Sequence, residues 1–411
     1  MLPGRSGELV VCSLLRQFIA LTKSKIDKAL NDRQENNLLK CMQLSEDVAY
    51  EQLLDALYAS AEFALPSLLR IFLQWYHSQH STGTQYSVHR RRCQSSGAQT
   101  YLADSMTSSY FSGSADKENQ RSIDVPAVTP LPTGRPDKMV KSVCEMSSVL
   151  RSICLTSSEA RTLAERRDLA IDIIFCQVLL SILRQLSYHP GHNEEIELVL
   201  EQSFKRFKYR EDLLSQNTEN VNIVADLYAE IVGLLSQTRF PLVRCRFMRC
   251  LNELRSKENS PNVRQSIISL IMGMKFFRVK MHPIEDFVSC FVFLQELGQY
   301  FLEAKEPEIK HVISDLFVEI LLPVAAVARQ EVNIPALKQF VENLYPTSVD
   351  LVNKKKHIPA LFPLVTCLLC VGTKSFFLNN WTNFLTICLS HLKNRNPKIA
   401  LVSLQSLSCL L

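Results

Sequence analysis

The stretch IKHVISDLFVEIL (residues 309–321) decides the fold class, because its apolar residues recur at intervals of three and four. They occupy positions 309, 312, 313, 316, 317, 320 and 321. A helix with 3.6 residues per turn gathers such positions on one face. We therefore expect an amphipathic helix that turns this face to the core, and Pro307 is well placed to open it.

The same periodicity continues on both sides of this stretch, from about residue 150 to the end of the chain. Ser260-Pro261 and Asn396-Pro397 each place a capping residue before a proline at the first helical position. Roughly a dozen helices joined by short polar turns are typical of stacked helix pairs, which form either a compact bundle or a solenoid. We predict an all-α, HEAT/armadillo-like helical-repeat solenoid with a long disordered insertion, because these repeats constrain only the apolar face.

The chain divides into three regions by composition. Residues 1–77 read as an N-terminal helical segment. Residues 78–145 are rich in Ser, Thr and Pro and have almost no periodic apolar residues, so we expect a disordered insertion. Residues 146–411 form the helical-repeat array. Its last stretch, PKIALVSLQSLSCLL, is apolar and periodic without a stop signal, so we expect the array to be truncated at this end.

Glycine is scarce, with 11 residues in 411, and the strings typical of nucleotide-binding loops and of α/β-hydrolases do not occur. Phosphate-binding loops and tight turns need the backbone freedom of glycine. Carboxylates and histidines occur singly on polar helix faces rather than in sets that converge. We therefore expect no enzyme activity, no catalytic residues and no cofactor.

The 13 cysteines are scattered through apolar runs, which favours reduced thiols in an intracellular protein. Cys367 and Cys370 have the spacing of a redox or zinc motif, but they lie in an apolar helix pattern, so we interpret them as core thiols and propose no metal site. The longest apolar run, residues 358–371, is shorter than the roughly 20 residues that span a bilayer, so we expect no membrane span.

Positive charge is concentrated between Arg239 and Lys280, where ten basic residues face two acidic ones. Within this segment we select a candidate partner-binding strip, made of Arg244, Arg246, Arg249, Arg255 and Lys257. Such a strip suits acidic helices, phosphorylated segments or the surface of a microtubule. The alternative is a solvated basic face whose neighbours restore neutrality. Nucleic acid is not expected, because no stacking aromatics or recognition motif accompany the charge.

Two short motifs fall in the predicted insertion. Lys117-Glu118-Asn119 matches a degradation signal that is read by the anaphase-promoting complex. Thr129-Pro130 has the pattern of a proline-directed phosphorylation site. Both patterns are short enough to recur at random, and their polar setting is what makes them candidates.

Several long strings resemble the N-terminal region of the Furry family of cell-morphogenesis proteins. They are ERRDLAIDIIF (165–175), NIVADLYAEI (222–231), QSIISLIMGMKFFRVKM (265–281), LFVEILLPVAA (316–326), ALFPLVTCLLCVGTKSFFLNNW (360–381) and LKNRNPKIA (392–400). The resemblance covers most of residues 46–411 and departs around residues 78–161.

This resemblance implies a non-catalytic scaffold that binds NDR-family kinases and their MOB co-activators and supports polarised growth, including neurite and dendrite patterning. It also implies links to microtubules or the cell cortex, and a cytoplasmic location at the cortex, at sites of polarised growth or on the cytoskeleton. A karyopherin-like transport adaptor or a microtubule-associated helical-repeat protein remains the alternative, because both are built on similar repeats.

Overall fold

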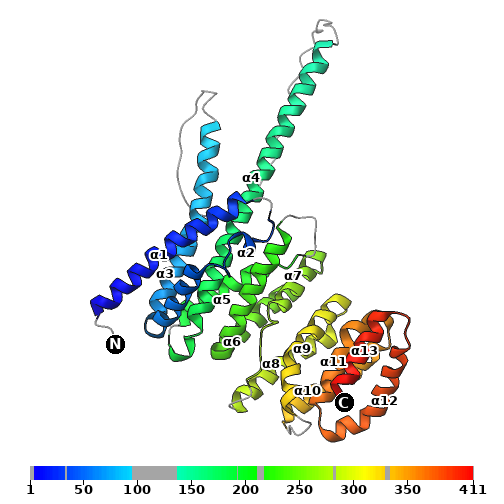
Figure 1. Ribbon diagram of the computed structural model, residues 1–411. Coiled ribbons are helices and arrows are strands. Elements are labelled where there is room, and N and C mark those ends of the chain that lie inside the picture. Colours follow the sequence, from blue (N-terminus) through cyan, green and yellow to red (C-terminus); the bar gives the residue numbers. More distant parts are fainter. Residues whose placement is uncertain are drawn as a thin grey trace, which may run out of the picture. The chain divides into compact units, whose positions relative to one another are not determined.

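The computed structural model describes residues 4–32, 35–94, 137–191, 193–210, 217–280, 284–328 and 334–410, and it describes their side chains except at residues 4–9, 81–158, 193, 284, 327–328 and 355 (Figure 1). Every regular element in these ranges is a helix, which confirms the all-α class. The elements are α1 (Gly4–Asn31), α2 (Leu38–Cys41), α3 (Val48–Gln94), α4 (Asp137–Leu183), the 3₁₀ helix η1 (Leu186–Tyr188), α5 (Asn193–Arg206), α6 (Thr218–Arg255), α7 (Pro261–Met272), α8 (Ile284–Glu303), α9 (Pro307–Ala328), α10 (Pro335–Val352), the 3₁₀ helix η2 (Lys355–His357), α11 (Ile358–Val371), α12 (Lys374–Leu392) and α13 (Pro397–Leu410).

Residues 1–77 and 165–411 form one compact unit, and residues 78–164 form another. Helices α3 and α4 each cross the boundary between the two units. Within the predicted insertion, helical backbone continues to Gln94 and resumes at Asp137. The remainder of the insertion, residues 95–136, lies outside the described residues, as do Lys117-Glu118-Asn119 and Thr129.

From α6 onward, each helix packs against the next helix but one. Helix α7 contacts α9, α9 contacts α11 and α11 contacts α13, while α8 contacts α10. The rings of Phe240 and Phe247 on α6 both meet the ring of Phe293 on α8. Two parallel rows of helices result, and Figure 1 shows their succession from green to red. This contact order is the one that stacked helix pairs produce.

Residues 309–321 lie in α9, as expected. Its apolar positions 309, 313, 316, 317, 320 and 321 are buried and position 312 is half-buried. The predicted helix starts are confirmed as well. The Ser260 side chain accepts a hydrogen bond from the backbone N–H of Val263 at 3.3 Å, and the Asn396 side chain accepts one from Lys398 at 3.0 Å. The basic loop before residue 358 leads into α11, whose side chains are mostly buried.

Two prolines bend long helices. Ala64 (φ −129°, ψ 19°) precedes Pro66 in α3, and Arg239 (φ −131°, ψ 41°) precedes Pro241 in α6. Proline lacks a backbone N–H and its ring clashes with the preceding turn, so the helix kinks there. Each of these helices therefore consists of two segments that can face different neighbours.

Close helix packing requires glycine at two positions. A Cβ atom at Gly233 would lie 2.7 Å from both the Cβ and the carbonyl oxygen of Phe276, and one at Gly273 would lie 2.4 Å from the Phe207 ring. Both distances are far below van der Waals contact, so no larger side chain fits without movement. Gly298 differs, because a Cβ there would meet Leu344 and Phe340 at an ordinary 3.5 Å. Close packing therefore explains Gly233 and Gly273 but not Gly298.

Arg166 of α4 attaches the N-terminal helices to the rest of their unit. Its buried guanidinium donates hydrogen bonds to the carbonyl oxygens of Ala29 (2.7 Å), Asp32 (3.0 Å) and Glu35 (2.7 Å). These carbonyls lie at the end of α1 and in the loop after it, where backbone acceptors lack helical partners. One arginine thereby caps α1 and joins it to α4.

One described helix, α3 over Val48–His80, is long and apolar enough to cross a membrane. The longest apolar run of the sequence, residues 358–371, is a different segment. Leu57, Leu65, Leu68 and Phe72 of α3 are buried in the protein core. Core helices meet the same criterion of length and composition, because burial in protein and burial in lipid select the same side chains.

Candidate docking surface

The second segment of α6, residues 240–255, carries most of the predicted basic strip. Val243, Phe247 and Leu251 form an apolar stripe along one side of this segment and are fully buried. The helical period then distributes the basic residues to both sides of this stripe. The strip is consequently divided between two neighbouring helices, α8 on one side and α5 on the other.

Arg244 and Arg255 turn to α8, where acidic residues neutralise them. Arg244 makes a bidentate pair with Glu296, with Nη2 2.7 Å from Oε1 and Nε 3.2 Å from Oε2. The Nη2 atom of Arg255 lies 2.8 Å from Oε2 of Glu303, and its guanidinium stands 4.5 Å from the centre of the Tyr300 ring. These two charges are engaged within the molecule.

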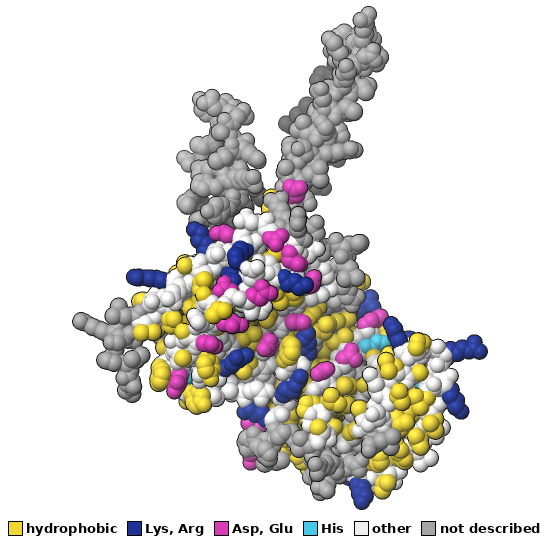
Figure 2. All heavy atoms as spheres, viewed as in Figure 1, with side chains coloured by type: hydrophobic (Ala, Val, Ile, Leu, Met, Phe, Trp, Pro, Cys, Tyr) yellow, Lys and Arg dark blue, Asp and Glu magenta, His cyan; other side chains and the backbone are white. Residues whose placement is uncertain are grey.

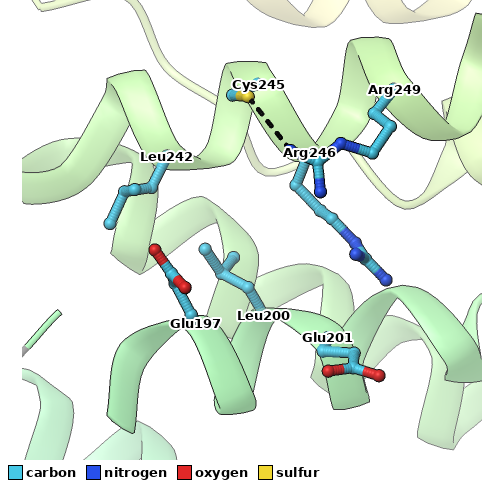
Figure 3. Close-up of a pocket in the computed structure, with 7 residues that line it drawn as sticks. All are labelled: Glu197, Leu200, Glu201, Leu242, Cys245, Arg246 and Arg249. Carbon is cyan, nitrogen blue, oxygen red and sulfur yellow. Dashed lines mark hydrogen bonds between the residues drawn. The ribbon is translucent and has the colours of Figure 1, made fainter. Parts of the chain in front are cut away.

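Arg246 and Arg249 turn to α5 and line a pocket of about 290 Å³ (Figure 3). The other lining residues are Glu197, Leu200, Glu201, Leu242 and Cys245. Figure 3 shows the side chain of Arg246 extending from α6 toward α5, on the side where Glu201 lies. Among the described residues, the buried Nε atom of Arg246 has no hydrogen-bond partner, and the one side-chain hydrogen bond of Arg249 goes to the Sγ atom of Cys245, at 3.8 Å. The pocket therefore combines two guanidinium groups with two carboxylates and with the side chains of Leu200, Leu242 and Cys245.

Glu201 is already paired at the rim of this pocket. Its Oε1 atom lies 2.7 Å from Nζ of Lys205, and this hydrogen bond, with a smaller contribution from the charge of Arg246, lowers the pKa of Glu201. Because Lys205 holds Glu201, the guanidinium groups of the pocket are not fully neutralised by it. Lys257, the fifth residue of the strip, lies exposed after the end of α6, and no side-chain partner is found for it among the described residues.

Most of the remaining basic residues between Arg239 and Lys280 also have partners. Lys275 pairs with Asp226 (2.6 Å) and Lys280 with Asp286 (3.0 Å). Arg239 donates to the carbonyl oxygen of His189 at 2.6 Å. Arg244, Arg255, Lys275 and Lys280 thus follow the alternative considered from the sequence, in which neighbours restore neutrality, whereas Arg246 and Arg249 do not.

Sequence reasoning missed a buried polar cluster around Asp172 of α4. The hydroxyl groups of Tyr76 (α3) and Tyr228 (α6) donate to its Oδ1 atom at 2.6 and 3.1 Å, and Arg206 (α5) lies 3.2 Å from Oδ2. Burial raises the pKa of the Asp172 carboxyl to about 6, against the lowering effect of Arg206. The carboxyl is inaccessible to solvent, so the cluster joins four helices rather than receiving a substrate. Its one sequence signal is an aspartate inside the apolar string LAIDIIF.

Cys367 and Cys370 behave as the core thiols that were expected. Cys367 is buried, and burial raises the pKa of its thiol to about 12. Burial also raises the pKa of the Cys370 thiol, to about 11. A neutral thiol is a poor nucleophile and a poor metal ligand. Across the described residues, no group of three or more His, Cys, Asp or Glu side chains is arranged to hold a metal ion.

Sequence reasoning also missed a second charged surface, on the first segment of α3. Its solvent side carries Glu51, Asp55 and Glu62 together with the exposed rings of Tyr58 and Phe63, and we name these five residues the acidic face of α3. Figure 2 shows acidic and hydrophobic side chains interspersed over the region where α3 and α5 lie. The signal was present in the sequence, because residues 46–69 contain five acidic residues and no basic one.

Comparison with known families gives one match that covers more than half of the chain. Residues 165–411 match the family described as "Cell morphogenesis N-terminal". The chain belongs to this family. The match confirms the resemblance to Furry-type cell-morphogenesis proteins, and it covers α5 to α13 together with the part of α4 that carries Arg166 and Asp172.

Two curated relatives have names that agree with the family. The cell polarity protein mor2 of Schizosaccharomyces pombe is 26% identical over 281 residues, which cover 68% of this chain and 13% of the relative. The cell morphogenesis protein PAG1 of Saccharomyces cerevisiae is 25% identical over 253 residues, which cover 61% of this chain and 10% of the relative. The matched part of this chain thus spans about a tenth of the length of these relatives. No solved structure matches.

Proposed function

We propose that this member of the cell-morphogenesis family is a non-catalytic scaffold in cell polarity and polarised growth, including neurite and dendrite patterning. It acts in the cytoplasm, at the cell cortex or on the cytoskeleton, and it binds NDR-family kinases and their MOB co-activators. The family match over residues 165–411 carries the proposal, and the names of the two yeast relatives agree with it. A stack of helix pairs suits this role, because it offers extended surfaces for partners.

The scaffold role also fits the chemistry of the described residues. The carboxyl of Asp172, whose pKa burial raises to about 6, is buried beneath Tyr76 and Tyr228, and the thiol of Cys367 is held neutral in the core. Catalysis needs titratable groups that reach a substrate. We therefore place the function of this chain in partner binding rather than in turnover.

Within the predicted strip we assign partner binding to Arg246, Arg249 and Lys257. Arg244 and Arg255 are paired with carboxylates of α8, whereas Arg246 and Arg249 line a pocket beside α5 and have no ion pair among the described residues. An acidic partner segment gains most from cations that have not already been neutralised, because each new pair then replaces contacts with water rather than an existing ion pair.

The test is a binding titration between the purified chain and an NDR-family kinase with its MOB co-activator. The variant carries Arg246→Glu, Arg249→Glu and Lys257→Glu. We expect at least a tenfold loss of affinity. The matched control carries Lys393→Glu, Arg395→Glu and Lys398→Glu, three exposed residues near the turn between α12 and α13, and it should bind within about twofold of the parent. Equal affinity for parent and strip variant, with both folded by circular dichroism, contradicts the assignment to this strip.

Two alternative functions would give different partners. Recovery of Ran from cytosol in a nucleotide-dependent manner would support a karyopherin-like adaptor. Cosedimentation with purified microtubules would support a microtubule-associated protein. Either result without kinase or co-activator binding would overturn the proposed scaffold role.

A further inference from the structure

The acidic face of α3 is exposed, and its carboxylates have no partner among the described residues. Glu51, Asp55, Tyr58 and Glu62 are spaced at four, three and four residues, so they form one stripe along the helix. The opposite side of the same helix is core, with Leu53, Leu57 and Ala61 buried. The stripe is therefore fixed in direction by the packing of the helix, and all of its members point into solvent.

The carboxylates of this face lack cations to neutralise them. No ion pair or side-chain hydrogen bond involves Glu51, Asp55 or Glu62 among the described residues. Lys25 of α1, which lies over the Tyr50 ring, pairs with Asp47 at 2.6 Å, and Arg70, the first basic residue that follows on α3, pairs with Glu195 at 2.9 Å. Like charges at i and i+4 repel, so this arrangement carries a small cost that a cationic partner would relieve.

Large apolar side chains accompany the carboxylates. Phe63 is 72% exposed, Val48 64% and Tyr58 42%. The ring of His189 binds the Ala61 carbonyl oxygen at 2.9 Å, so η1 lies beside α3, and the neighbouring Tyr188 is also 72% exposed. Exposed aromatic groups with a charged rim are typical of protein-binding surfaces.

We propose that the acidic face of α3 docks a basic, amphipathic helical segment of a partner protein. Apolar residues of that segment cover Tyr58 and Phe63, and its Lys and Arg side chains pair with Glu51, Asp55 and Glu62. An amphipathic segment would thus be recognised by an exposed helix face through charge complementarity, with aromatic anchors and a carboxylate rim. The surface is separate from the α5–α6 pocket and would serve a second partner of opposite charge.

A membrane is the less favoured occupant of this face. Helix α3 has the length and apolar content of a spanning helix, yet its exposed side carries three carboxylates, which repel anionic lipid surfaces and are costly to bury in hydrocarbon. A cationic peptide instead removes the repulsion among the carboxylates. The three carboxylates of this face therefore favour a basic protein segment over a lipid surface as its occupant.

The test uses a fluorescent synthetic helix of Leu and Lys, about five turns long, with the Leu residues on one face. A second peptide of identical composition in scrambled order is the control for charge alone. Binding to the whole chain is followed by fluorescence anisotropy at low and at physiological ionic strength. A photo-crosslinker on the apolar face of the peptide identifies the contact by mass spectrometry.

Two variants of the chain separate the anchors from the charges. Neutralising Glu51→Gln, Asp55→Asn and Glu62→Gln together should weaken binding about tenfold, since each exposed pair contributes some tenths of a kcal/mol. Phe63→Ser should weaken it by a similar factor. The matched control, Glu253→Gln, Glu258→Gln and Glu285→Gln, neutralises three exposed carboxylates elsewhere and should change the affinity less than twofold.

We expect the amphipathic peptide to crosslink to residues 48–63 and to bind at least fivefold more tightly than the scrambled peptide. Crosslinks elsewhere, or equal losses in the test and control variants, overturn the proposal. Binding to neutral phosphatidylcholine vesicles that is lost in Phe63→Ser would assign the face to lipid and also overturn it. Each variant differs at exposed side chains, so circular dichroism and thermal unfolding verify that it is folded.

Discussion

The second segment of α6 and the first segment of α3 carry opposite charges and use them differently. The second segment of α6, residues 240–255, belongs to the most basic stretch of the chain, yet Arg244 and Arg255 are paired with Glu296 and Glu303 of α8. The first segment of α3 has fewer charged residues, and its three exposed carboxylates have no partner among the described side chains. The segment with fewer charged residues is thus the one whose charges have no ion pairs among the described side chains.

An excess of charge along the chain therefore does not measure the charge that is available to a partner. Stacked helices bring residues about 50 positions apart into contact, as with Arg244 and Glu296, and the acidic side chains of α8 neutralise the basic ones of α6. On α3, by contrast, no basic side chain among the described residues pairs with Glu51, Asp55 or Glu62. The charge that is available to a partner depends on which side chains are already paired in the tertiary structure.

The largest effect is expected at the buried side of α3. Tyr76→Phe removes a hydroxyl that donates to the buried Asp172 carboxylate at 2.6 Å, and we expect it to lower the free energy of unfolding by about 2–3 kcal/mol. Tyr58→Phe on the exposed side of the same helix should change it by less than about 0.5 kcal/mol. Urea denaturation of both variants measures the two values. Similar losses in both would mean that the exposed side is in fact packed.

A pH dependence should follow from the Asp172 carboxyl, whose pKa burial raises to about 6. Between roughly pH 4 and 6 the folded state keeps a proton that the unfolded state has lost, so this group contributes stability at low pH that is lost as the pH rises. We expect the stability of the parent relative to Asp172→Asn to fall by about 2 kcal/mol across that window and to level off above about pH 7. A relative gain in stability with rising pH would show instead that Arg206 dominates and holds this pKa low.

A smaller effect is expected for the paired arginines of α6. A double-mutant cycle of Arg244→Ala and Glu296→Ala should give a coupling energy of about 0.5–1 kcal/mol, because the bidentate pair is partly exposed. The matched cycle, Arg249→Ala with Glu197→Ala, joins two residues that line one pocket without an ion pair and should give about zero. Equal couplings in both cycles would remove the distinction between paired and free charges on α6.

The smallest effect is expected for the acidic face of α3 in the absence of a partner. Neutralising Glu51→Gln, Asp55→Asn and Glu62→Gln should raise the free energy of unfolding by a few tenths of a kcal/mol at low ionic strength, because it relieves like-charge repulsion along the helix. The gain should vanish in high salt, where the repulsion is screened. Thermal unfolding at both ionic strengths measures it. A loss of stability at either would reveal an intramolecular partner for these carboxylates.

Local periodicity was enough to predict the helices, their proline starts and the apolar stripe of residues 309–321, because these features depend on residues three or four apart. The kink of α6 at Arg239 follows from Pro241, whereas the pairing of Arg244 with Glu296 depends on which helix lies beside which. No spacing in the sequence encodes that neighbour. The Asp172 cluster likewise assembles residues from four helices, of which only the aspartate in an apolar string was visible beforehand.

Footprinting of carboxyl groups in the native protein, with a water-soluble carbodiimide and an amine, tests the difference between the two regions most directly. Labelling rates are measured by mass spectrometry before and after urea unfolding. We predict that Glu51, Asp55 and Glu62 react almost as fast in the folded chain as in the unfolded chain, whereas Glu296 and Glu303 are slowed several-fold by their arginines. Equal protection of the two sets would contradict the account, since it would place partners on α3 or remove them from α8.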